Sequence, residues 1–165
     1  MPFTNSSSLV AADMNNTLRG LYRDNSNHAV TGTTAETDLA SLTITGGTID
    51  TTGCLHVIAA GTITTATDTK RIRLYLGATA IVDTTAVTGT GDWWIDCWIA
   101  NTAANAQRIV ATWSTPNSAT NFNKDYTTAA IDTSSNAILK VTGTLANAAD
   151  TVTQTVFMVF VAQVT

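Results

Sequence analysis

Residues 53–61 read Gly-Cys-Leu-His-Val-Ile-Ala-Ala-Gly, and they give the clearest indication of the fold class. Side chains along it alternate between two faces, which is the period-two pattern of a β-strand, and a glycine bounds each end. Similar short strands occur at residues 71–77 and 92–100, separated by turn-forming residues. We expect an all-β protein, because short strands with frequent turn signals are typical of sandwiches and barrels.

The same pattern continues to the end of the chain. Further strands are expected at residues 38–45, 107–113, 127–131, 137–142 and 152–164. No helical segment separates them, which excludes βαβ units. The sequence therefore predicts a jelly roll or β-sandwich of about eight antiparallel strands over residues 38–165.

Residues 1–37 differ from the rest of the chain. Val10, Met14, Leu18 and Leu21 recur at helical spacing, which predicts a short helix. A helix of about three turns is marginal by itself and must dock on something. We interpret residues 1–37 as an N-terminal arm that carries this helix.

Composition limits the classes of function. Only 12% of the 165 residues are charged and 44% are hydrophobic, so the chain folds but has few ionic groups. A net charge of -4 without a basic tract excludes a nucleic-acid groove. The sequence has no membrane-spanning stretch and no signal peptide, so we expect synthesis in a cytoplasm, with Cys54 and Cys97 reduced and packed in strands.

Catalytic motifs are not recognisable. His28 and His56 lack a nucleophile motif, and Asp96 is the only acid inside a strong strand. A single buried acid does not make the carboxylate pair that a glycosidase needs. Metal-ligand spacings and phosphate-binding loops are also missing. We expect no enzymatic activity, no cofactor and no metal site.

Two strands, at residues 92–100 and 152–164, are apolar on both faces. A sandwich sheet normally buries one face, so something must cover the other. A subunit interface is one explanation, with candidate residues Trp94, Trp98, Phe157, Val159 and Val161. The alternative is that residues 1–37 cover such a sheet within the same chain.

Aromatic side chains allow a second interpretation. Trp94 and Trp98 share one strand face, and Tyr75 could lie beside them. Aromatic platforms bind sugars, but they also anchor protein interfaces and cores.

Several segments carry a resemblance to a known family. Residues 31–44 read Thr-Gly-Thr-Thr-Ala-Glu-Thr-Asp-Leu-Ala-Ser-Leu-Thr-Ile, and residues 70–81 read Lys-Arg-Ile-Arg-Leu-Tyr-Leu-Gly-Ala-Thr-Ala-Ile. Together with residues 53–61, Asp92-Trp93-Trp94-Ile95 and Ala106-Gln107-Arg108-Ile109, they resemble a strand pattern of structural proteins from tailed bacteriophages. Such proteins resemble trimeric jelly rolls that decorate or cement capsids, or form the heads of fibres.

This resemblance implies a homotrimeric capsid decoration or cement protein. Its partner would be the major capsid protein, and it would lie on the capsid surface of the virion after synthesis in the host cytoplasm. The arm, through Val10, Met14, Leu18 and Leu21, would contact the capsid or a neighbouring subunit. The alternative is a receptor- or glycan-binding fibre-head module, with Tyr75, Trp94 and Trp98 as contacts.

Overall fold

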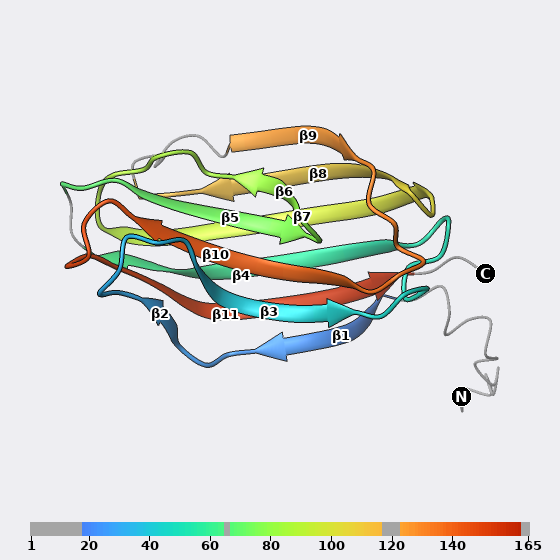
Figure 1. Ribbon diagram of the computed structural model, residues 1–165, viewed down its shortest axis with the longest axis horizontal. Coiled ribbons are helices and arrows are strands. Elements are labelled where there is room, and N and C mark those ends of the chain that lie inside the picture. The colour runs from blue at the N-terminus through green and yellow to red at the C-terminus, as the bar shows by residue number, and fades with distance from the viewer. Residues whose placement is uncertain (1–17, 65–66, 117–122, 163–165) are drawn as a thin grey trace, which may run out of the picture.

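The computed structural model describes residues 18–64, 67–116 and 123–162, and these residues form an all-β sandwich (Figure 1). The strands are β1 (Arg19–Asp24), β2 (His28–Val30), β3 (Thr37–Ile44), β4 (Cys54–Thr64), β5 (Lys70–Leu76), β6 (Thr79–Asp83), β7 (Gly91–Ala103), β8 (Ala106–Ser114), β9 (Asn123–Ala129), β10 (Ala137–Leu145) and β11 (Thr151–Ala162).

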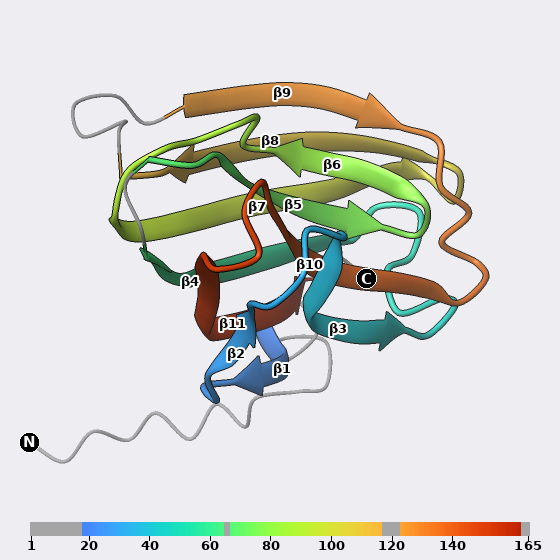
Figure 2. The same cartoon turned by 60° about the vertical axis from the view of Figure 1, so that its left-hand side comes forward.

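The strands form two antiparallel sheets that pack face to face (Figure 2). The larger sheet has the order β1-β11-β4-β7-β8-β9, and β2 also pairs with β11. The smaller sheet has the order β3-β10-β5-β6. The chain crosses between the sheets several times, for example from β3 to β4 and from β10 to β11. Strands far apart in the sequence therefore become neighbours.

The core lies between the two sheets. Leu55 and Val57 on β4 and Phe157 and Val159 on β11 point into it and are fully buried. The smaller sheet contributes Ile72, Leu74, Leu76, Leu139 and Val141, which are also fully buried. Each such side chain contributes roughly 1.5–3 kcal/mol through removal from water, which is why the alternating pattern determines the fold.

The prediction of an all-β sandwich is confirmed, but the strand count was too low. The described residues contain eleven strands. A jelly roll has eight strands in two Greek keys, and the seven-plus-four arrangement does not confirm that narrower prediction. The strands missing from the prediction are β1, β2 and β6. The last is a short strand that follows a hairpin turn at Gly77, whose φ is 58°.

The predicted helix is wrong where it falls on described residues. Leu21 lies in β1, which pairs with β11, and Leu18 directly precedes that strand. A register shift between Gly20 and Tyr22 places an extra residue in β1. Such a bulge interrupts the period-two alternation at Leu21, so this short strand has no clear strand pattern in the sequence. Val10 and Met14 lie outside the described residues.

Residues 18–37 belong to the sandwich. Both β1 and β2 pair with β11, and the amide of Gly32 donates to the carbonyl of Ala148. The boundary predicted between residues 37 and 38 falls at the start of β3. Since β1 and β2 extend the edge of the larger sheet, residues 18–37 do not cover its outer face.

Candidate functional site

A row of large side chains crosses the outer face of the larger sheet. On β7, Trp98 is in register with His56 of β4 and Val110 of β8. His56 is in turn opposite Phe160 of β11, and Val110 is opposite Tyr126 of β9. Directly opposite residues of antiparallel strands share a face, so these five side chains form one row, which we call the aromatic row.

The aromatic row is only partly protected from water. Trp98 is 40% exposed, Val110 49% and Tyr126 67%, which are high values for large hydrophobic side chains. Two flanking rows lie on the same face; one consists of Met158, Ile58, Asp96, Thr112 and Lys124, and the other of Val156, Ala60, Trp94 and Ser114. Their apolar members lie mainly on β11, β4 and β7, and their polar members lie mainly on β8 and β9. We call the three rows together the outer apolar face.

His56 lies at the centre of the outer apolar face and contacts side chains on β7 and β11. Its ring stacks on Trp98 with centroids 4.1 Å apart and an interplanar angle of 5°, and the Phe160 ring lies 5.9 Å away on β11. The Nε2 of His56 is 3.0 Å from Oδ1 of Asp96, a hydrogen bond in which the ring donates. The Nδ1 atom is buried without a partner among the described residues. The histidine therefore orients the indole of Trp98 and satisfies the acid in the middle of an apolar surface.

The residues predicted for a subunit interface divide between the two sides of the sheet. Trp94 and Trp98 lie on the outer apolar face. Phe157, Val159 and Val161 are buried between the sheets and cannot form a contact with another subunit. The prediction assigned β11 the wrong face, because both faces of this strand are apolar and alternation alone does not say which is inside.

The residues predicted for glycan binding do not come together. Tyr75 lies on β5 of the smaller sheet, whereas Trp94 and Trp98 lie on β7 of the larger one. The hydroxyl of Tyr75 donates to Glu36 Oε1 at 3.0 Å.

The outer face of the smaller sheet has a different character. Glu36 accepts hydrogen bonds from Arg73 at 2.8 Å and from Thr142 at 2.6 Å. Asp83 accepts from the guanidinium groups of both Arg71 and Arg73. Burial alone would raise the pKa of Asp83, but hydrogen bonds from Arg71, Thr85 and Arg73 outweigh it and lower that pKa to about 2. These charged groups satisfy one another within the chain.

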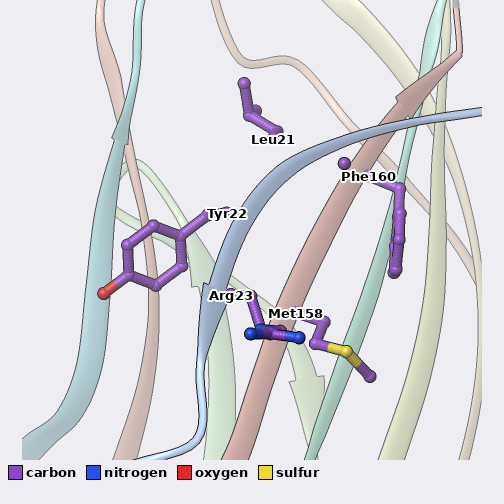
Figure 3. Close-up of a pocket in the computed structure, with 6 residues that line it drawn as sticks. Leu21, Tyr22, Arg23, Met158 and Phe160 are labelled. Atoms are coloured by element: carbon purple, nitrogen blue, oxygen red, sulfur yellow. The ribbon is translucent and has the colours of Figure 1, made fainter.

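A shallow pocket lies where β1 meets β11 (Figure 3). We call it the edge pocket; it has a volume of about 310 Å³ and is lined by Gly20, Leu21, Tyr22, Arg23, Met158 and Phe160. Figure 3 shows Met158 and Arg23 close together, whereas the Tyr22 ring lies on the other side of β1. The Tyr22 ring makes an edge contact with Phe157 at 5.8 Å. The open side of the edge pocket is therefore continuous with the outer apolar face through Phe160.

Groups for metal chemistry are not assembled in the part of the chain that the structure describes. In it, no cluster of three or more His, Cys, Asp or Glu side chains could hold a metal ion. Cys54 and Cys97 are free, and burial raises the pKa of the Cys97 thiol to about 12. The described residues also contain no helix long and apolar enough to cross a membrane.

The fold and the outer apolar face define a β-sandwich protein with one apolar and one polar outer surface. Comparisons with family models, curated proteins and solved structures found no match.

Proposed function

We propose that this protein is a structural subunit that assembles with copies of itself through the outer apolar face, and that the assembly decorates a virion capsid. The observation that supports self-assembly is the aromatic row, with Trp98, Val110 and Tyr126 exposed across three adjacent strands. The capsid part rests on the strand pattern that resembles structural proteins of tailed phages.

The extent of the outer apolar face suits a protein contact. Five strands about 4.8 Å apart and three rows about 7 Å apart cover roughly 500 Å². A patch of this size on a monomer is often functional, and a specific interface buries about 800 Å² on each partner. The sheet face thus supplies the centre of such an interface, and adjoining loops would supply its rim.

The contrast between the two outer faces supports the same choice of surface. On the smaller sheet, Arg73, Glu36 and Asp83 form a network of paired charges that water can solvate. On the larger sheet, His56 Nε2 lies 3.0 Å from Asp96 Oδ1, so a partner that covers this carboxylate leaves it with a hydrogen-bond donor. Burial of the aromatic row would therefore remove exposed apolar surface from water, which the paired charges of the smaller sheet do not offer.

The proposed mechanism on a capsid is mass action. A homotrimer that binds the assembled shell better than its separate parts stabilises the shell by about 2.7 kcal/mol per site when its concentration is 100 times Kd. The major capsid protein is the proposed partner, and the virion surface is the proposed location. Neither role requires a catalytic group.

Two matched substitutions test self-assembly. Val110 on the larger sheet and Ile138 on the smaller sheet are both exposed aliphatic residues, 49% and 50% respectively. We expect light scattering to give a trimer for the native chain and for Ile138→Lys, but a monomer for Val110→Lys. Only the lysine at position 110 would be buried in the subunit interface, where an unpaired charge is costly. A monomeric native protein at micromolar concentration would refute self-assembly, as would equal behaviour of the two variants.

The capsid role needs a separate measurement. Quantitative mass spectrometry of purified virions should find the protein in hundreds of copies if it covers the shell. A few dozen copies would point to a fibre, and complete absence would exclude both roles.

A fibre-head role remains the second candidate, because the exposed indole of Trp98, stacked on His56, is a surface on which a sugar ring can lie. Glycan titration followed by tryptophan fluorescence distinguishes the two roles. Sugar binding that disappears in Trp98→Ala, while the oligomeric state is unchanged, would support the fibre-head role.

A further inference from the structure

The edge pocket lies next to the point where the described chain begins. Leu18 is 46% exposed, and the lining of the pocket starts two residues later at Gly20. We propose that the edge pocket is the docking site for residues 9–14 of the same chain.

The connection is short enough for this contact. Met14 is four residues before Leu18, so their Cα atoms lie at most about 14 Å apart. Asn15 and Asn16 stand between them, and asparagine is common where a chain reverses direction. A tether of this length gives the segment an effective concentration in the millimolar range, which favours its own pocket over that of another molecule.

The chemistry of the segment matches that of the pocket. Residues 9–14 read Leu-Val-Ala-Ala-Asp-Met, and Asp13 is the only charged side chain in residues 1–17. The pocket combines the apolar side chains of Leu21, Met158 and Phe160 with the guanidinium of Arg23. Among the described residues, the guanidinium of Arg23 has no ion-pair partner. The composition of the segment, apolar with one acid, is therefore complementary to that of the pocket, which is apolar with one base.

Docking would divide the outer apolar face into two parts. Residues 9–14 would cover Met158 and Phe160 at the β1–β11 edge. Trp98, Val110 and Tyr126, on the strands farther from that edge, would remain available for other copies. Self-assembly would then use the part of the outer apolar face on β7, β8 and β9. The two proposals can fail separately, because one is tested by contacts of Met14 and the other by the oligomeric state.

The three methionines of the chain provide a test without any substitution. Met1, Met14 and Met158 are the only ones, so methyl-¹³C labelling of methionine gives three NMR signals. We expect a nuclear Overhauser contact between the methyl groups of Met14 and Met158, and a shift of the Met14 signal caused by the Phe160 ring. Met1 is the internal control, and Met14→Leu and Met158→Leu assign the signals.

Charge exchange tests the polar half of the contact. Arg23→Asp should move the Met14 signal to the position of an unstructured methionine, and the double variant Arg23→Asp with Asp13→Arg should restore it. A Met14 signal as narrow and unshifted as that of Met1 in the native protein would overturn the proposal. A contact seen only between differently labelled chains in a mixed sample would also overturn it, because the occupant would then be a neighbouring copy.

Discussion

Lys70 and Asp150 are buried charged residues that the sequence does not single out. Their side chains are 0% and 1% exposed, and Lys70 Nζ lies 3.1 Å from Asp150 Oδ2. Lys70 Nζ also donates to the carbonyl of Asp68 at 2.8 Å, while the contact with Asp150 is ionic without aligned hydrogen-bond geometry. The pair joins the start of β5 to the residue before β11.

We expect removal of one partner to be costly, because the other charge stays buried. Lys70→Met should lower the free energy of unfolding by about 3–5 kcal/mol, measured by urea denaturation. Lys140→Met is the matched control: it breaks the exposed pair with Asp38 and should cost at most about 1 kcal/mol. Equal losses in the two variants would contradict a special role for the buried pair.

Asp83 makes stability depend on pH in the acid range. Its pKa in the folded protein, about 2, is below the ordinary value of 3.8, so the ionised form stabilises the fold. That contribution is complete above about pH 4 and is lost as the pH falls towards 2. Because the side chain is partly exposed, we expect only about 1 kcal/mol.

The measurement is urea denaturation at a series of pH values between 5 and 2. Asp83→Asn should flatten this part of the stability curve, and high salt should weaken the effect in the native chain by screening the arginines. An identical slope for the native chain and the variant would show that Asp83 does not contribute.

At the scale of the elements, the close approach of β4 and β11 limits what the sheet tolerates. A Cβ added at Gly61 would lie 1.8 Å from the carbonyl oxygen of Thr153 on β11. The register of these strands shifts between Gln154 and Val156, beside this contact. Position 61 therefore requires glycine, because the backbone of β11 leaves no room for a Cβ atom.

Gly61→Ala should lower the free energy of unfolding by at least about 2 kcal/mol, because the two strands must separate to admit the methyl group. Gly20→Ala on β1 is the control, since nothing lies within 4 Å of its added Cβ. Chemical denaturation of the two variants measures the difference. A Gly61→Ala protein as stable as Gly20→Ala would show that the strands adjust without cost.

The elements also show where sequence patterns succeed. Strands β4, β5, β7 and β8 have one fully buried side, so alternation locates them. In β9 most side chains are exposed on both faces. The sequence predicts this strand at residues 127–131, whereas the structure has it at Asn123–Ala129. Where both faces of a strand are equally exposed, neither face requires apolar side chains, so apolar and polar residues do not alternate along it.

At the scale of the whole molecule, the two outer faces make the protein asymmetric. The smaller sheet presents self-paired charges, and the larger sheet presents the aromatic row and the edge pocket. This asymmetry is what the proposals of self-assembly and of segment docking have in common. It arises from the order of the strands, which gathers side chains from five strands into one surface.

Local sequence patterns predict that the protein is all-β and which side chains alternate along most strands, because each of these properties depends on neighbours in the chain. They also indicate that β7 and β11 are apolar on both faces. Which face is inside, and which residues meet in the aromatic row, follow only from the way the sheets pair and pack. Register is set by pairing between distant segments: His56 lies opposite Phe160 from the far end of the chain, and no local pattern contains that information.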